Sequence, residues 1–159
     1  MTPQRVARVV VASTRAARGV YADTTGPLIA DWLAARGFLV DEVDVVADGE
    51  PVGAAIRAGV YAGDDLVITT GGTGLSPSDR TPEHTRALLD VEIPGLADAI
   101  RRAGLPAVPT ATLSRGTAGV ADRTLVVNLP GSAGGVRDGL SVLAAVLDHA
   151  LDQIRGGDH

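Results

Sequence analysis

A buried-strand pattern that ends abruptly in glycines is the feature that most constrains this chain. Residues 66–70 form an apolar run rich in β-branched side chains that ends at Thr70, and Gly71, Gly72, Thr73 and Gly74 follow directly. Such a run is typical of a buried parallel strand. Glycines after it let backbone N–H groups converge on an anion. The segment therefore predicts a phosphate-binding loop or, as the alternative, a plain glycine-rich turn between a strand and a helix.

A carboxylate close behind these glycines favours the phosphate site. Asp79 lies five residues after Gly74, and a carboxylate approaches a phosphate only where a cation lies between them. Two better-known phosphate motifs do not fit. The Walker pattern needs a lysine, and the chain has none, whereas the dinucleotide fingerprint needs a glycine where Pro77 stands. The pattern therefore indicates a Mg²⁺–nucleotide site.

Length and composition predict one globular domain over residues 1–159. No linker interrupts the chain, and 3% aromatic residues indicate a core of aliphatic side chains. A net charge of −5 without a basic patch argues against nucleic-acid binding. No 18-residue apolar run could span a membrane, and residues 1–8 do not resemble a signal peptide. We therefore expect a cytoplasmic protein that binds neither membranes nor nucleic acids.

Some chemistries are excluded by residue type. The chain has no cysteine, which removes disulfides, thiol nucleophiles and thiolate metal sites. The three histidines, His84, His149 and His159, are too scattered to suggest a metal cluster. His84 is expected to be solvated. Carboxylates and glycine loops remain as the candidates for function.

Strands alternate with helices along the sequence. The predicted strands are residues 6–12, 38–46, 66–70 and 124–129, with a weaker one at 108–113. Residues 13–25 are expected to be a loop. The predicted helices run from near Pro27 to Gly37, over 51–61, from just after Asp79, over 94–103 with Arg101 towards solvent, and over 136–154.

This order predicts an α/β fold, a three-layer α/β/α arrangement around a mostly parallel sheet. In such sheets, ligands bind at the carboxyl ends of the strands. The turns expected at that edge are residues 13–25, 48–50, 71–79 and 130–135, which contain most of the polar and glycine-rich turn residues of the chain.

Several motifs together resemble the MogA/MoaB family of molybdopterin adenylyltransferases, which includes gephyrin's G domain. They are Thr-Thr-Gly-Gly-Thr-Gly at 69–74, Asp-Arg-Thr-Pro-Glu at 79–83, Ile-Pro-Gly-Leu at 93–96, Leu-Ser-Arg at 113–115 and Asn-Leu-Pro-Gly-Ser at 128–132. The resemblance runs from about residue 8 to residue 154. It implies an enzyme of molybdenum cofactor biosynthesis that joins molybdopterin to the AMP part of ATP with Mg²⁺, and a homotrimer.

The resemblance also implies a set of site residues. Asp48 and Asp79 match family positions that organise Mg²⁺ and the ATP phosphates, although either could instead be an ordinary turn residue. The positions matched near substrate or nucleotide are Ser13, Asp23, Thr70, Gly71, Gly72, Thr73, Gly74, Ser114, Arg115, Pro130, Gly131 and Ser132. Ser13 and Asp23 could instead cap local structure, and Ser114 and Arg115 could be surface residues.

Three departures from the family pattern concern nucleotide affinity. Thr14 stands where the family usually has an aspartate, Gly49 where it often has a second acid, and Ala133 where it has a proline. Two other functions stay open. One is a non-catalytic family member that binds pterin or serves as a scaffold, and the other is a nucleotide pyrophosphatase like the CinA proteins.

Overall fold

A mixed seven-stranded sheet forms the middle of the molecule in the strand order β2-β1-β4-β7-β6-β5, with β3 also paired to β1. The computed structural model describes residues 3–20 and 22–157; Tyr21, within the predicted loop 13–25, and His159 lie outside them. The central strands are β1 (Val6–Ala12), β4 (Leu66–Thr70) and β7 (Thr124–Leu129), all parallel. Their bounds are those predicted, because each is a mainly apolar run rich in β-branched residues.

The two sides of the sheet differ in strand direction. The short strands β2 (Leu39–Val40) and β3 (Asp44–Val46) pair with β1 in parallel. On the other side, β6 (Ala118–Ala121) runs antiparallel to β7, and β5 (Val91–Glu92) runs antiparallel to β6. The sheet is therefore mostly parallel, as predicted.

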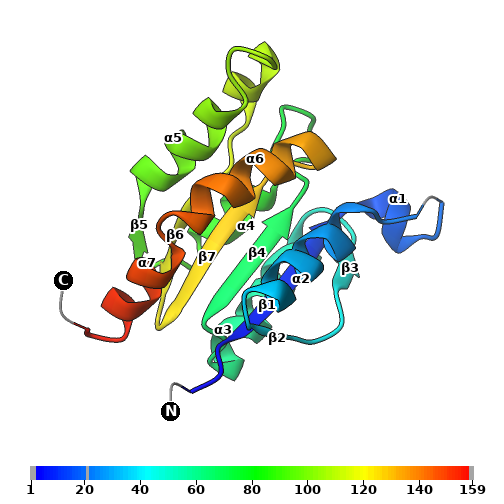
Figure 1. Cartoon of the computed structure of the whole chain (residues 1–159). Helices are drawn as coiled ribbons and strands as arrows, with labels where there is room; N and C mark the ends of the chain where they lie inside the picture. Colours follow the sequence, from blue (N-terminus) through cyan, green and yellow to red (C-terminus); the bar gives the residue numbers. More distant parts are fainter. Residues whose placement is uncertain (1–2, 21, 158–159) are drawn as a thin grey trace.

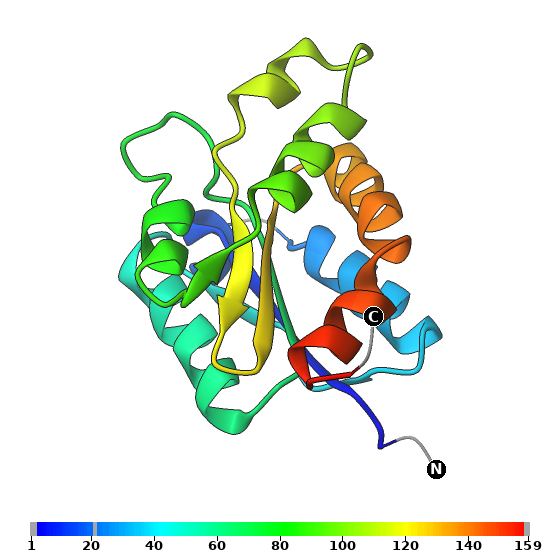
Figure 2. The same ribbon diagram turned by 90° about the vertical axis from the view of Figure 1, so that its left-hand side faces the viewer.

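Helices cover both faces and give the predicted three layers (Figures 1 and 2). The helices α2 (Thr25–Ala35), α5 (Pro94–Ala103), α6 (Ala133–Ala144) and α7 (Leu147–Ile154) pack on one face. The helices α3 (Glu50–Ala62) and α4 (Thr81–Arg86) pack on the other. Of the helices in the described part of the chain, none is long and apolar enough to cross a membrane.

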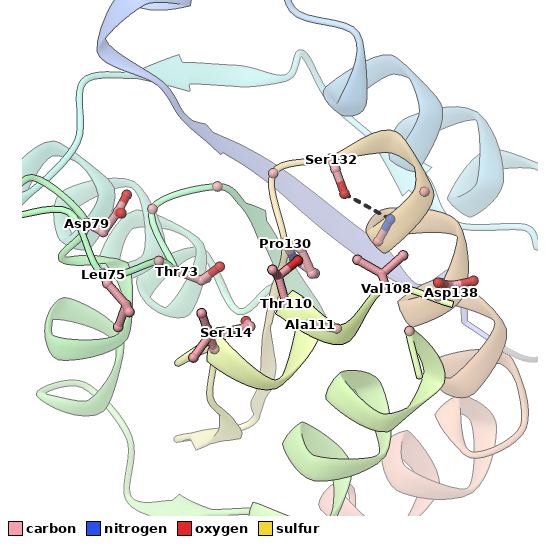
Figure 3. Close-up of a pocket in the computed structure, with 18 residues that line it drawn as sticks. Thr73, Leu75, Asp79, Val108, Thr110, Ala111, Ser114, Pro130, Ser132 and Asp138 are labelled. Atoms are coloured by element: carbon pink, nitrogen blue, oxygen red, sulfur yellow. Dashed lines mark hydrogen bonds between the residues drawn. The ribbon is translucent and has the colours of Figure 1, made fainter. Parts of the chain in front are cut away.

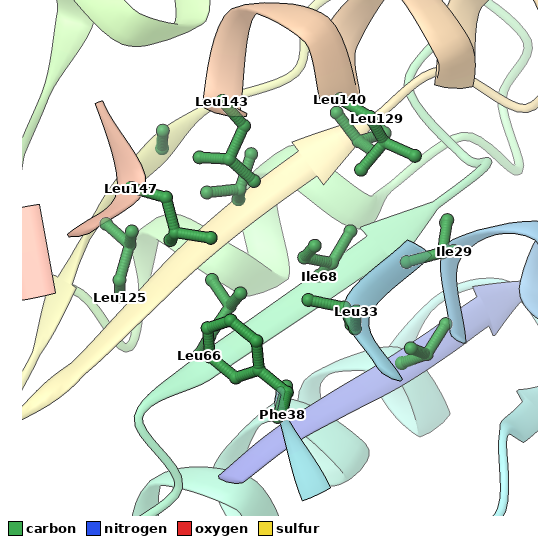
Figure 4. Close-up of a cluster of buried hydrophobic side chains, with 14 of the residues drawn as sticks. Ile29, Leu33, Phe38, Leu66, Ile68, Leu125, Leu129, Leu140, Leu143 and Leu147 are labelled. Atoms are coloured by element: carbon green, nitrogen blue, oxygen red, sulfur yellow. The ribbon is translucent and has the colours of Figure 1, made fainter. Parts of the chain in front are cut away.

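The larger core lies between the sheet and the α2–α6–α7 layer (Figure 4). Leu66 and Ile68 of β4 meet Ile29 and Leu33 of α2 there, and all four side chains are fully buried. Burial of each aliphatic side chain stabilises the fold by roughly 2 kcal/mol. This packing therefore holds the central strands firmly against the helix layer. The loops that follow those strands are thus held by a rigid support.

Two predicted elements are divided in the structure. The strand expected at 38–46 is split into β2 and β3, because the polar pair Asp41-Glu42 is exposed between them. The helix expected at 136–154 starts earlier and breaks between α6 and α7. The apolar spacing continues across that break, so periodicity alone did not reveal it.

Other predictions were wrong. Residues 108–113 do not form a strand: Pro109–Leu113 is a 3₁₀ helix, η1, which ends before Ser114. The loop predicted at 13–25 includes the short helix α1 (Thr14–Ala17). Arg101 does not point only to solvent, because its guanidinium donates to the carbonyl oxygens of Ser114 and Gly116.

Candidate active site

The four turns expected to meet do meet at one edge of the sheet. β1, β3, β4 and β7 run in parallel and in register, so the segments after Ala12, Val46, Thr70 and Leu129 leave the sheet side by side. Direct contacts join them: the Ser13 N–H donates to the Val46 carbonyl oxygen at 2.9 Å, and the Gly71 N–H donates to that of Leu129 at 3.1 Å. The predicted gathering of turns is confirmed.

The first glycines of the loop after β4 are required by close contacts. Gly71 and Gly72 both have positive φ, of 91° and 68°. A Cβ added at Gly71 would lie 2.5 Å from the Ala12 carbonyl oxygen, and one at Gly72 would lie 2.2 Å from Thr81 Oγ1. L side chains rarely adopt this backbone conformation. The loop can therefore pass between β1 and α4 only with glycine at these positions.

Asp48 reaches this glycine loop from the end of β3. Its Oδ2 accepts hydrogen bonds from the Thr14 N–H at 3.2 Å and the Thr14 hydroxyl at 3.0 Å, and its own N–H donates to Thr14 Oγ1 at 3.1 Å. Its Oδ1 would lie 3.2 Å from a Cβ at Gly72. The threonine that replaces the usual family aspartate thus holds Asp48 by donating to it, which an ionised carboxylate could not do.

Asp79 reaches the same loop from the other side. Its Oδ2 accepts from the Ser76 N–H at 3.0 Å and would lie 2.8 Å from a Cβ at Gly74. No hydrogen bond to Oδ1 of Asp79 or Oδ1 of Asp48 is present among the described residues. Two carboxylates, each with one oxygen free to bind a ligand, therefore lie beside glycines two positions apart.

Arg115 is bound to the loop rather than turned towards open solvent. Its Nε donates to the Gly74 carbonyl oxygen at 2.9 Å, one terminal nitrogen donates to the Asp79 carbonyl oxygen at 2.6 Å, and the other forms an ion pair with Glu83 at 2.7 Å. Its main-chain N–H donates to the Thr73 carbonyl oxygen. The prediction that Arg115 contacts substrate stays a prediction, and the contacts present connect it to the protein.

The ion pair changes the acidity of both partners. The hydrogen bond from Arg115, its largest cause, holds the pKa of Glu83 below the ordinary value of 4.5. The same hydrogen bond, which Arg115 donates to Glu83, raises the pKa of Arg115, which stays protonated in any case. Both groups are therefore charged at neutral pH.

A pocket of about 630 Å³ opens between the glycine loop, η1 and the start of α6 (Figure 3). Its charged lining residues are Asp79 and Asp138, which Figure 3 places at opposite sides. Predicted site residues that line it are Gly71, Gly72, Thr73, Gly74, Asp79, Ser114, Pro130, Gly131 and Ser132. Apolar lining comes from Leu75, Val108, Ala111 and Leu113.

The turn after β7 presents the start of α6 to this pocket. Ser132 is the N-cap of α6, and its Oγ accepts from the Gly135 N–H at 3.1 Å. In the described chain, no protein acceptor binds the N–H groups of Ser132, Ala133 or Gly134. Such free donors at the positive end of a helix favour an anion. The structure therefore has two adjacent backbone cradles, one after β4 and one after β7.

Thr70, Ser13 and Asp23 lie at a smaller cavity of about 90 Å³ behind Gly71 and Gly131. The Thr70 hydroxyl donates to the Pro130 carbonyl oxygen at 2.7 Å and so ties the two glycine turns together. Ser13 accepts from the Ala16 N–H and Asp23 accepts from the Gly26 N–H, so both cap local structure. Their predicted role in ligand binding remains a prediction.

The sequence pattern did not indicate that Thr14, Val108, Thr110, Ala111 or Asp138 belongs to the site. The residues of η1 were missed because that segment was expected to be a strand, which would have placed them in the sheet. Asp138 could have been found, since it lies one helical turn after Gly134 and Gly135. Thr14 had been noticed only because it differs from the aspartate usual in the family.

The donor set fits a divalent cation. Mg²⁺ typically takes one or two protein carboxylates and fills its other positions with water and phosphate oxygens. The free oxygens of Asp48 and Asp79 meet this need, and the hydroxyl of Thr81, fully buried beside Gly72, makes no hydrogen bond among the described residues. No cluster of three or more His, Cys, Asp or Glu is placed to hold a metal in the described chain. A cation bound here would therefore be held by few protein carboxylates and would take its other ligands from water and phosphate oxygens.

Comparison with known proteins agrees with this geometry. The chain is 35% identical over 154 residues to the molybdopterin adenylyltransferase of Helicobacter pylori strain J99, covering 93% of this chain and 86% of that protein. It is 39% identical over 155 residues to the molybdenum cofactor biosynthesis bifunctional protein of Synechococcus elongatus, covering 96% of this chain but 48% of that protein.

Solved structures show the same fold. The molybdopterin biosynthesis Mog protein from Mycobacterium ulcerans superposes with a TM-score of 0.92 at 66% identity, covering 94% of this chain and 99% of that one. The CinA protein from Thermoplasma acidophilum, at 20% identity and a TM-score of 0.67, shares the fold alone. The family described as "Probable molybdopterin binding domain" matches residues 8–149. The chain therefore belongs to this molybdopterin-binding family of molybdenum cofactor biosynthesis, and its predicted resemblance to MogA and MoaB is confirmed.

Proposed function

We propose that this protein is a Mg²⁺-dependent molybdopterin adenylyltransferase, which transfers AMP from ATP to the terminal phosphate of molybdopterin and releases pyrophosphate. The observation that carries the proposal is the pair of carboxylates, Asp48 and Asp79, beside Gly72 and Gly74 of one loop that borders a pocket of about 630 Å³. The relative named molybdopterin adenylyltransferase supports the same reaction.

The reaction needs little acid–base help from the protein. A phosphate oxygen of molybdopterin attacks the α-phosphorus of ATP, a new P–O bond forms, and the bond from that phosphorus to pyrophosphate breaks. Pyrophosphate leaves with the bonding electron pair. Because the attacking phosphate is already anionic at neutral pH, no general base is required, and the protein's task is to position two polyanions.

The charge of the pocket explains why a cation is needed. Its charged lining residues, Asp79 and Asp138, would repel a triphosphate. Bound Mg²⁺ would supply positive charge between the carboxylates and the phosphates. Asp48 and Asp79 would hold it, and the free amides at the start of α6 would orient phosphate oxygens.

The two other functions predict different chemistry. A scaffold member would bind pterin without turnover, yet it would not need the two carboxylates at the loop. A CinA-like pyrophosphatase would cleave free nucleotides, but the comparison with CinA supports only the fold. The carboxylate pair and the adenylyltransferase relatives favour the first function.

A single reaction mixture distinguishes the three functions. Purified protein is incubated with molybdopterin, ATP and Mg²⁺, and small molecules are identified by mass spectrometry. We expect AMP-linked molybdopterin with one pyrophosphate per product, and no product when the metal is chelated. Bound pterin without product would indicate a scaffold, and nucleotide cleavage independent of pterin would indicate a pyrophosphatase; either result would contradict the proposal.

We further propose that residues 1–159 act as one domain, in the cytoplasm, and that the protein is a homotrimer. The trimer is what the family resemblance implies. Exposed apolar side chains, among them Leu39 at one sheet edge and Val91 at the other, offer surface for subunit contacts. Light scattering should give three times the monomer mass of 16.1 kDa, and a monomeric mass at micromolar concentration would contradict it.

A further inference from the structure

Arg115 joins both ends of the segment that carries Asp79. Its guanidinium donates to the carbonyl oxygen of Gly74, where the segment begins, and to that of Asp79, where it ends. Its main-chain N–H holds the preceding carbonyl oxygen, that of Thr73. Arg115 comes from the strand-like stretch after η1, far from this loop in sequence. One side chain therefore fixes the span between the glycines and the carboxylate.

The segment has little other support. Residues 75–78 are exposed, and the hydrogen bonds made inside them among the described residues join Ser76 and Asp79 to each other. A loop with so few contacts samples many conformations unless its ends are held. The contacts of Arg115 supply this restraint.

Glu83 holds Arg115 in turn. Its Oε2 accepts from the guanidinium at 2.7 Å, and the two side chains are only 29% and 34% exposed. Each of the three guanidinium nitrogens thus donates to a protein oxygen, and a carboxylate balances the charge. Three of its five N–H groups are thus committed to the protein and its charge is balanced by a carboxylate, which favours a role in holding the protein over binding a substrate phosphate.

We propose that Arg115 is a positioning residue, which, anchored by Glu83, holds residues 74–79 so that the Asp79 carboxylate is ready to bind Mg²⁺. The inference rests on the proposed function for its kinetic consequence. The restraint of the loop is a property of the protein without ligands, so it can be tested whether or not the adenylyl transfer is confirmed.

The first test measures amide hydrogen exchange in the protein without ligands. Arg115→Gln and Glu83→Gln should raise the exchange rate of amides in residues 73–79 about tenfold, while amides of α7 stay unchanged. Arg115→Lys should protect the loop only in part, because an ammonium cannot bridge two carbonyl oxygens and a carboxylate in one plane. Arg102→Gln, at an exposed arginine of α5, is the matched control and should change nothing. Wild-type exchange in both Arg115 variants would overturn the proposal.

The second test separates positioning from substrate binding. In Arg115→Gln, the Mg²⁺ concentration for half-maximal activity should rise about tenfold, whereas the KM for molybdopterin should stay the same. Glu83→Gln should act in the same direction, and the double variant should lose less than the product of the two losses. A raised KM for molybdopterin with unchanged Mg²⁺ dependence and a silent Glu83→Gln would show direct substrate contact and overturn the proposal. If Arg115→Gln does not fold, Arg115→Lys and Glu83→Gln decide both tests.

Discussion

The two glycine turns at the edge of the sheet look alike in sequence but differ in how they are held. At the turn after β4, a Cβ on Gly71, Gly72 or Gly74 would come within 2.8 Å of backbone or side-chain oxygens. At the turn after β7, a Cβ on Gly134 would have no atom within 4 Å, and one on Gly131 would reach only 3.4 Å from Gly71 Cα. Gly135 of the second turn is also close-packed, since a Cβ there would lie 2.9 Å from Pro130 Cβ and from Ser132 Oγ. The first turn is therefore packed at all three glycines, whereas the second is open at Gly131 and Gly134.

This difference separates two tasks that glycine can perform. In the first turn, glycine lets the protein pack closely around the loop, which brings Asp48 and Asp79 to fixed places. In the second, glycine leaves space at the start of α6, where a phosphate could approach the backbone. Under the proposed function, we expect the first turn to position the two carboxylates and the second to bind an anion.

The substitution Asp79→Asn tests the proposed role of the first turn and has the largest expected effect. We expect turnover to fall by about a hundredfold to a thousandfold, since a carboxylate proposed to position the metal is lost, while the melting temperature stays within a few degrees. An asparagine can still accept from the Ser76 N–H, so the loop keeps that hydrogen bond. Kinetics and thermal unfolding are measured on the same preparation. Wild-type turnover would mean that Asp79 is only structural.

Gly72→Ala and Gly134→Ala contrast the packed turn with the open one. The first puts a methyl group against Thr81 Oγ1 at φ +68° and should lower the free energy of unfolding by about 2–4 kcal/mol. The second, in a helix and without neighbours, should change stability by less than about 1 kcal/mol, in the stabilising direction, yet weaken ATP binding. Urea unfolding and nucleotide titration check both. Equal losses of stability would remove the distinction between the turns.

Ser132→Ala tests whether the second turn is built as a helix start. Loss of the N-cap hydrogen bond to the Gly135 N–H should cost about 1 kcal/mol of stability. Because the α6 amides should remain in place, the KM for ATP is expected to rise only a few-fold. Ser132→Thr keeps a capping hydroxyl and serves as the control. A variant as stable as the wild type would show that the cap does not support this turn.

The pH dependence of stability reports the restraint on the first turn. Glu83 has a folded pKa below 4.5, so its ionised form favours the folded state. That contribution is complete above the unfolded pKa and is lost as the pH falls through the folded value. Melting temperatures of wild type and Glu83→Gln should therefore differ at pH 7 and converge as the pH is lowered well below 4.5. A constant difference across this range would contradict the assignment.

The sequence predicted the central strands and the edge of the sheet where the site lies. The bounds of β4 and β7 were predicted correctly because short, mainly apolar runs rich in β-branched side chains favour buried strands. β6 was missed because Ala118 to Ala121 contains small residues and Gly119, which carry almost no strand signal. The turn after β6 contains Asp122 at a φ of 54°, and the sequence pattern does not predict this backbone conformation.

The site was only partly predictable for the same physical reason. Glycines and carboxylates after strands could be named, since topology brings them together. What each one contacts depends on tertiary packing: Thr14 holds Asp48, and Arg115 binds three oxygens of the protein. The contribution of residues 108–113 to the pocket was not predicted from the sequence. A short, mainly apolar run beside two prolines is compatible with either a strand or a 3₁₀ helix.

The position of the cation tests the central claim most directly. Crystals grown with Mn²⁺ and a non-hydrolysable ATP analogue would give an anomalous difference peak at the metal. We predict one peak at about 2.1–2.2 Å from a free carboxylate oxygen of Asp48 or Asp79, with the phosphates between it and the start of α6. A metal bound at residues 130–135, away from both aspartates, would contradict the division of tasks between the two turns.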